Sequence, residues 1–255
     1  MAADPSAAGP SAASEIARMH DPDRFLTALF APAARRERLF VLIAFNHELV
    51  RALEMTASRA AAGPMAALIR LQWWRDVIAG QSGGHELAAP LSALLAAGAL
   101  PRDTLLALIE AREAEAQGLE TMRAWRDATL AGAGGLQVAF AQALGEADPA
   151  VLDRLRAIGA AYGAGATLRH LPALLKAGRE PLPMEAPADT TAWLREAGQG
   201  WLRQAGKPRL PRERRAAGLI RVLASRDLSR DSTASARRGL GDRLAVAGAF
   251  LRAAA

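Results

Sequence analysis

Cysteine is absent from the sequence. Its absence excludes disulfides, thiolate metal sites and a cysteine nucleophile, and it fits a protein made for a reducing compartment. Long apolar runs are missing too, since no uncharged stretch approaches the roughly 18 residues that indicate a transmembrane helix. The C-terminal run LAVAGAFLRAAA is too short to span a bilayer and contains an arginine. The sequence therefore predicts no membrane-spanning segment.

The first twenty residues, MAADPSAAGPSAASEIARMH, lack the basic start and the apolar run of a secretory signal. We expect residues 1–20 to form a disordered tail. Residues 21–255 are long enough for one sizeable core, because a chain of this size buries roughly 70% of its unfolded surface. With 51% hydrophobic and 23% charged residues in the chain, we expect one globular domain located in the cytoplasm.

Strand signals are almost missing, because apolar and polar residues rarely alternate and β-branched residues do not cluster between turns. Apolar residues at helical spacing dominate instead, so the predicted fold class is all-α. Proline and glycine mark the ends of the expected helices. These helices cover approximately residues 22–30, 32–56, 65–79, 89–98, 101–145, 149–176, a stretch after Asp189, 212–224 and 236–252. The region 101–145 is expected to be two helices that meet near Gly118, or three if the GAGG segment also breaks the helix.

Two features of composition suggest ligands only weakly. The segment Gly132–Gly135, GAGG, would be a phosphate loop only after a strand, and none is predicted there. We interpret it as a helix junction or a close helix crossing. The net charge of +6 favours anionic partners such as nucleic acid, anionic lipid or diphosphates, although arginines that cover solvated helix faces give the same balance.

Four pieces of the chain, in order, resemble the squalene/phytoene synthase family. RFLTALFAPAARRERLFVLIAFNHELVRALEM is similar to its first helices, and RLQWWRD resembles its Trp-Trp-Arg helix. The segment from LIEAREAE to QALG resembles its middle helices. YGAGATLRHLPALLKAGREPLP resembles its second substrate-binding segment. The resemblance covers roughly residues 24–183.

The resemblance implies an isoprenoid synthase-type helical bundle around a central apolar cavity, in which family members condense two prenyl diphosphates head to head. Members carry aspartates four residues apart on two facing helices, a spacing that places both carboxylates on one helix face. There they bind Mg²⁺, which also contacts the substrate phosphates and neutralises the leaving diphosphate. The carboxylates are therefore essential to the family's chemistry.

This sequence departs from the family at both aspartate positions. In the first motif Val50 and Arg51 stand where paired aspartates are expected, and Glu54 takes the last acidic position. In the second motif the family's arginine is kept as Arg169, whereas His170 and Leu174 replace aspartates. A guanidinium near a divalent cation repels it by several kcal/mol even at an effective dielectric of about 20. We therefore predict no metal site and no catalytic residue.

Two interpretations of the remaining polar residues stay open. They can form a metal-free anion pocket, because arginine presents donors that match phosphate oxygens, or the bases can pair with Glu48, Glu54 and helix C-termini. A replacement metal site would have to use the middle-helix acids, and a solvated, salt-bridged surface that includes Arg112 and Arg123 is the simpler interpretation of that helix. The middle-helix acids are Glu110, Glu113 and Glu115. The candidate substrate-binding residues are Phe45, His47, Arg51, Glu54, Arg169, His170 and Arg179.

Other classes of function find little support in the sequence. The tryptophans lie in predicted helices among leucine and alanine, which indicates packing and not a base-stacking platform, so we predict no nucleic-acid partner. No strand-turn segment exists for a serine hydrolase. His20 and His85 are interpreted as loop histidines, because no histidine pair has zinc spacing on a helix.

The pieces AFNHEL, LQWWRD and TLRHLP are more similar to a branch of the family that acts in the assembly of respiratory complex I than to active synthases. The resemblance implies a protein that has lost prenyl transfer, needs no cofactor, and has complex I subunits or a prenyl lipid or diphosphate as partners, with peripheral contact at the inner membrane. An active transferase that uses Mg²⁺ and a prenyl-lipid binding protein are the alternatives. A fold does not bring its function with it, so these are expectations by analogy.

Overall fold

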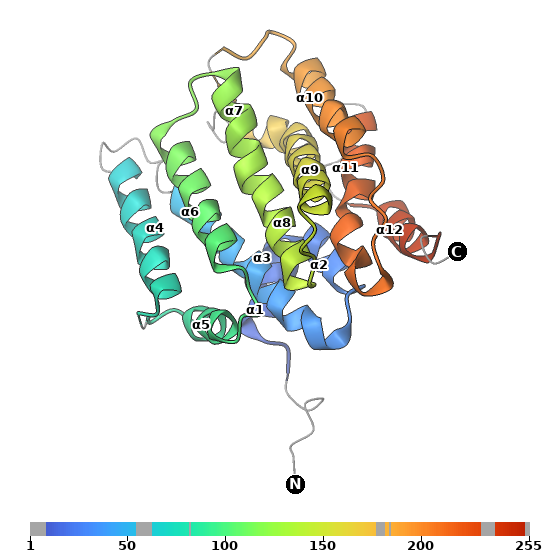
Figure 1. Cartoon of the computed structure of the whole chain (residues 1–255). Helices are drawn as coiled ribbons and strands as arrows, with labels where there is room; N and C mark the ends of the chain where they lie inside the picture. The colour runs from blue at the N-terminus through green and yellow to red at the C-terminus, as the bar shows by residue number, and fades with distance from the viewer. Residues whose placement is uncertain are drawn as a thin grey trace.

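The computed structural model describes residues 9–54, 63–81, 83–176, 182–183, 185–230 and 238–252. Within these ranges every regular element is a helix (Figure 1), so the all-α prediction is confirmed. The helices are α1 (Ala12–His20), α2 (Pro22–Ala28), α3 (Ala33–Glu54), α4 (Gly63–Ala79), α5 (Ala88–Ala96), α6 (Arg102–Gln117), α7 (Met122–Thr129), a π-helical segment η2 (Leu130–Gly134), α8 (Gly135–Ala143), α9 (Pro149–Lys176), α10 (Thr190–Ala205), a 3-10 segment η3 (Arg212–Gly218), α11 (Ile220–Ser229) and α12 (Leu240–Arg252).

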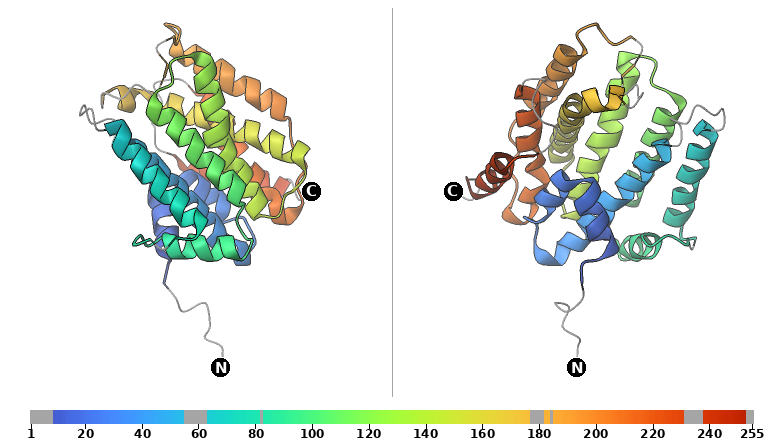
Figure 2. Two further views of the ribbon diagram at one scale, coloured as in Figure 1. Left: turned by 60° about the vertical axis from the view of Figure 1, so that its left-hand side comes forward. Right: turned by 180° about the vertical axis from the view of Figure 1, so that it is seen from behind.

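Helix α9 lies in the interior of the bundle. It packs against α8, α10, α11 and the π-helical segment, while α3 packs against α1, α4, α6 and α8 on the other side. Figures 1 and 2 show α4 and α5 at one edge of the bundle and α11 and α12 at the opposite edge. None of the helices in the described ranges is both long enough and apolar enough to cross a membrane.

Helix α1 corrects the expectation of a disordered tail over residues 1–20. Its N-terminus is capped, because the Ser11 Oγ atom accepts a hydrogen bond from the Ser14 backbone N–H at 3.1 Å. The helix packs against α3, with Ala13 and Ala17 fully buried. Alanine is small enough to let two helices approach closely. The contact between α1 and α3 is the feature that composition alone did not indicate. Residues 1–8 lie outside the described ranges.

The glycine-rich segment is a close helix crossing, as predicted. Helices α7 and α8 continue through the π-helical segment without a loop, and α9 crosses this point. A Cβ atom on Gly159 would lie 2.5 Å from the Ala133 carbonyl oxygen, and one on Gly134 would lie 2.8 Å from the Arg156 carbonyl oxygen. Both distances are shorter than van der Waals contact, so glycine is required on both sides of the crossing.

The tryptophans belong to the core and its edge, as predicted. Trp74 is fully buried and its ring meets Phe45 edge-on with 5.4 Å between centroids. At the other end of the bundle Trp125 lies against Trp193 and Trp201, with ring centroids 4.7 and 5.9 Å away. Rings in these arrangements stabilise the fold through apolar burial and edge-to-face contact.

Helix boundaries agree with the predictions to within a few residues for α2, α3, α4 and α9. The C-terminal part differs. A 3-10 segment precedes α11, and α11 ends at Ser229 instead of near residue 224. The later end of α11 is explained by Arg195 of α10, whose guanidinium donates to the carbonyl oxygens of Leu228 and Arg230 at 3.0 and 2.8 Å. In the proline-rich segment between α9 and α10, residues 177–181 and 184 lie outside the described ranges.

Candidate functional site

Glu48 of the first motif lies on α3 and faces α4 and the segment before α5. Glu48 is buried, with 2% of its side chain exposed. One carboxylate oxygen accepts from Arg51 Nη1 at 2.8 Å, and the other accepts from Arg70 Nη2 at 3.0 Å. The His85 Nε2 atom lies 3.5 Å from the same oxygen as Arg70. We call Glu48, Arg51, Arg70 and His85 the α3–α4 group.

The charge of Glu48 is compensated within this group. Burial alone would raise the pKa of Glu48, but hydrogen bonds from Arg51 and Arg70 and the positive charge of Arg51 outweigh burial and lower it below its ordinary value. The carboxylate is therefore ionised near neutral pH. Arg51 stands where the family has an aspartate, and in the structure it pairs with Glu48. For Arg51 this supports the interpretation in which the bases pair with acids of the protein.

The neighbours of Glu48 contact other helices. The His47 ring stacks on His20 of α1, with centroids 3.8 Å apart and an angle of 10° between the planes. His20 is therefore a helix residue and not a loop residue. Asn46 accepts a long hydrogen bond of 3.4 Å from Arg112 of α6. Phe45 is fully buried against Trp74, so its position in the structure is a packing position.

The middle-helix acids on α6 are paired with arginines. Glu113 accepts two hydrogen bonds from Arg75, at 3.0 and 2.7 Å, and Glu115 accepts from Arg112 at 2.6 Å. Glu110 lies 3.9 Å from Arg75 and is largely exposed. This arrangement supports the salt-bridged surface over the replacement metal site.

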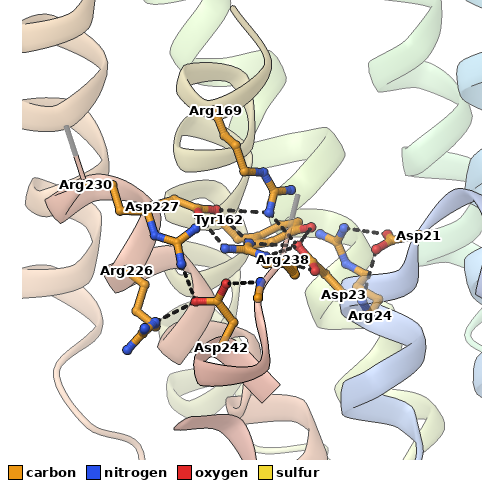
Figure 3. A network of polar contacts seen from close by, with 11 residues as sticks. Asp21, Asp23, Arg24, Tyr162, Arg169, Arg226, Asp227, Arg230, Arg238 and Asp242 are labelled. Atoms are coloured by element: carbon orange, nitrogen blue, oxygen red, sulfur yellow. Dashed lines mark hydrogen bonds and ion pairs between the residues drawn. The ribbon is translucent and has the colours of Figure 1, made fainter. Parts of the chain in front are cut away.

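Arg169 of α9 lies in a second ionic group that joins three helices and the segment before α12 (Figure 3). Its Nη1 atom is 3.0 Å from Asp23 Oδ2 of α2 and 3.6 Å from Asp227 Oδ2 of α11. Arg238, two residues before α12, donates to Asp23 at 2.7 Å and to Asp227 at 2.7 Å. Tyr162 of α9 donates its hydroxyl to Asp23 at 2.9 Å. We call these five residues the α9 cluster.

The α9 cluster holds two buried carboxylates against two arginines. Burial raises the pKa of Asp227, and the hydrogen bond from Arg238 offsets this only in part. For Asp23 the hydrogen bond and charge of Arg238, together with Arg169, outweigh burial and lower the pKa. Burial and the nearby acids raise the pKa of Tyr162 well above its ordinary value, so its hydroxyl remains a donor.

A third carboxylate attaches α12 beside this cluster. Asp242, in the first turn of α12, is 1% exposed and accepts from Arg226 Nε at 2.7 Å and from Arg230 Nη2 at 2.5 Å. Burial would raise its pKa, but the two arginines and the Gly239 backbone N–H lower it to about 2. Figure 3 shows this group next to Arg238.

The candidate residues of the sequence divide between two groups that share no residue. Arg51 belongs to the α3–α4 group and Arg169 to the α9 cluster. His170 and Leu174 follow on α9, where His170 is exposed and Leu174 is half-buried. Glu54 is the last residue of α3, but its side chain is outside the described part of the structure, as is Arg179.

Sequence reasoning missed most of the α9 cluster. Asp23, Tyr162, Asp227 and Arg238 carry no motif that would mark them as partners of Arg169, and up to 215 residues separate them along the chain.

The residues present do not suit Mg²⁺. Asp23 and Asp227 are already bound by arginines, and no three acidic or histidine side chains of the described ranges are placed to share a metal ion. That the whole chain has no metal site stays a prediction.

Comparison with known proteins agrees with this architecture. The family model described as squalene/phytoene synthase matches residues 17–255. The crystal structure of squalene synthase HpnC from Alicyclobacillus acidocaldarius is similar with a TM-score of 0.66, at 20% identity over 85% of this chain and 90% of that one. A dehydrosqualene synthase in complex with ligand gives a TM-score of 0.71, at 12% identity over 94% of each chain.

At these identities the structural matches establish the fold alone, and they confirm the predicted isoprenoid synthase-type bundle. The central cavity, the loss of prenyl transfer and the role in complex I assembly stay predictions. A search of curated protein sequences gave no significant match. The family match extends over most of the sequence and includes both segments where the aspartates are replaced. The chain belongs to the squalene/phytoene synthase family.

Proposed function

We propose that this chain keeps the scaffold of its family without metal-dependent prenyl transfer. The observation behind the proposal is the pairing of Arg51 with buried Glu48 at 2.8 Å. A side chain that would have to be an aspartate for Mg²⁺ binding is here a cation, and its partner Glu48 is already shared with Arg70. A divalent ion entering at this point would face two guanidinium groups.

The second motif supports the same proposal. Arg169 is 10% exposed and lies between Asp23 and Asp227, so its charge is compensated inside the protein. To bind a diphosphate it would have to exchange buried carboxylates for the ligand, which costs several kcal/mol when a buried charge is left unpaired. Among the described residues of the two motifs, Arg51 and Arg169 are therefore both already paired with buried carboxylates of the protein.

The direct test is an activity assay. Purified protein with Mg²⁺ and radiolabelled farnesyl or geranylgeranyl diphosphate is expected to give no condensed hydrocarbon above a control without protein. An active squalene synthase run in parallel shows that the assay works. Formation of presqualene diphosphate, squalene or phytoene would contradict the proposal and establish the transferase alternative, with which the family match is equally consistent.

We further propose that the retained scaffold acts in the assembly of respiratory complex I. The support is the similarity of AFNHEL, LQWWRD and TLRHLP to the family branch with that role. Deleting the gene in its native host is expected to lower NADH:ubiquinone oxidoreductase activity and leave succinate oxidation intact. Missing squalene, carotenoids or hopanoids together with normal NADH oxidation would contradict it.

A complementation experiment separates shape from chemistry. Glu54→Ala removes the last acidic residue of the first motif and is expected to restore NADH oxidation in the deletion strain as well as the unaltered gene does. Gly159→Leu, which places a large side chain in the crossing of α9 with η2, is expected to fail because the fold is lost. A Glu54→Ala gene that fails while its protein accumulates normally would show that the carboxylate is needed.

Prenyl-lipid binding is the third possibility. Measuring whether binding depends on a metal distinguishes it from prenyl transfer, which uses Mg²⁺. If the chain binds a prenyl diphosphate without a metal, calorimetric affinities measured with and without EDTA should agree. An affinity that falls when EDTA is added would show that a metal ligand set exists outside the residues described above.

A further inference from the structure

Helix α12 presents leucines to solvent along one line. Leu240, Leu244 and Leu251 are 72%, 62% and 68% exposed. At about 100° per residue these positions fall within an arc of roughly 40° and extend over about 16 Å. The opposite face is buried through Asp242 and Val246, which are 1% and 0% exposed. We call the three leucines the α12 stripe.

The orientation of the stripe is fixed by contacts on the inner face. Asp242 is bound by Arg226 and Arg230 of α11, and Phe250 lies against Phe30 with 5.1 Å between ring centroids. Rolling the helix to hide its leucines would break the ion pairs of a buried carboxylate. Figures 1 and 2 place α12 at the edge of the bundle beside α11, where its outer face is accessible.

The exposed charged residues of α12 itself are all of one sign. Arg243 and Arg252 are exposed on α12, whereas the helix's acidic residue, Asp242, is buried and paired. The outer surface of α12 thus combines leucines with arginines and offers no accessible carboxylate of its own. Such a surface is complementary to a layer that is negatively charged outside and apolar beneath.

The size of the stripe distinguishes the possible occupants. A stable interface with a protein takes roughly 20–30 residues a side, and three leucines on one helix fall far short of that. A lipid bilayer sets no such minimum, because each side chain inserts separately and arginines can extend to the headgroups. We propose that α12 docks the protein on the surface of an anionic lipid bilayer, with the α12 stripe inserted and Arg243 and Arg252 at the phosphates.

The proposal is independent of whether prenyl transfer is retained, and vesicle binding tests it. The full chain is floated with phosphatidylcholine vesicles that contain or lack phosphatidylglycerol. We expect binding to the anionic vesicles that weakens as salt is raised. Arg243→Gln combined with Arg252→Gln should reduce binding to anionic vesicles by about tenfold or more, since each arginine near such a surface contributes separately.

The leucines are tested against a matched control. Replacing Leu240, Leu244 and Leu251 together by serine should lower binding at least about 100-fold, because burying each leucine is worth roughly a factor of ten or more. Replacing Met65, Ile69 and Leu175 by serine removes three equally exposed apolar side chains elsewhere, 60%, 65% and 57% exposed, and should leave binding unchanged. Circular dichroism checks that both triple variants are folded.

Three results would overturn the proposal. The first is that the full chain does not float with anionic vesicles. The second is that both triple variants lose binding equally, which would mean that any exposed apolar residue suffices. The third is that light scattering finds a dimer that only the α12 variant converts to a monomer, which would make the stripe an interface between two copies of the chain.

Discussion

Arg238 and Asp23 are 215 residues apart in the sequence, yet Arg238 Nη2 donates to Asp23 Oδ2 at 2.7 Å. The same guanidinium binds Asp227 at 2.7 Å, so one side chain joins α2 and α11 to the segment before α12. Its loss would leave the two buried carboxylates with Arg169 as the one remaining cation of the cluster. We regard Arg238 as the central cation of the α9 cluster.

The first prediction concerns Arg238→Gln. This change should lower the free energy of unfolding by about 3–5 kcal/mol, because it leaves buried charge uncompensated. Urea denaturation at pH 7 measures it. Arg123→Gln is the control, since Arg123 is 92% exposed in a loose ion pair of 3.8 Å and should change stability by less than about 0.5 kcal/mol. Equal losses in the two variants would show that the cluster is not a buried unit.

The second prediction concerns the pH dependence given by Asp242. Its pKa is about 2 in the folded protein and 3.8 in the absence of its partners. A lowered pKa stabilises the fold fully above pH 4, and the stabilisation is lost as the pH falls through about 2. Asp242→Asn should therefore cost on the order of 2 kcal/mol at pH 7.

This difference between Asp242→Asn and the unaltered protein should shrink between pH 4 and 2. Parallel urea titrations across this range measure it. A cost that stays constant down to pH 2 would mean that the carboxylate's charge contributes nothing and that only shape is lost.

The third prediction is an asymmetry within the α3–α4 group. Glu48→Gln should destabilise the protein by about 1–3 kcal/mol, because it weakens charged hydrogen bonds to two arginines at a buried site. Arg51→Gln should cost less than about 1 kcal/mol, since Arg51 is 49% exposed and Arg70 still binds Glu48. Chemical denaturation of both variants tests the order. If Arg51→Gln were the more damaging, Arg51 would have a role beyond pairing with Glu48.

The fourth prediction concerns the helix crossing. Gly159→Ala should destabilise the protein by about 1–3 kcal/mol, because its Cβ would overlap the Ala133 carbonyl oxygen and the Gln137 side chain. Gly200→Ala on α10 is the control, where the nearest atom is Arg203 Nη2 at 3.8 Å. It should raise stability by about 0.5–1 kcal/mol through lower backbone entropy of the unfolded chain. Calorimetric melting of both variants would show opposite shifts, and equal shifts would contradict the crossing.

The sequence was a good guide to the helices and a poor guide to the pairs between them. Helical spacing of apolar residues, proline at helix starts and glycine at breaks are local signals, and they located α2, α3, α4 and α9 closely. Helix α1 was missed because its burial depends on α3 and not on its own composition. Arg51 and Arg169 are candidate binding residues in the sequence, and that role stays a prediction. Pairing with Glu48 was one of two open interpretations for the bases, whereas Asp23 and Asp227 were not identified as partners of Arg169.

The sequence by itself determined the helical class, the family and the replacement of aspartates at Val50 and Arg51, since all of these follow from residue types at fixed spacing. Only the tertiary structure decided that Arg51 pairs with Glu48, that Arg169 shares Asp23 with Arg238, and that α12 turns its leucines outward. The reason is physical. Helix formation is set by neighbours a few residues away, whereas the partner of a charge and the face of a helix that is buried depend on segments brought together by packing of the whole chain.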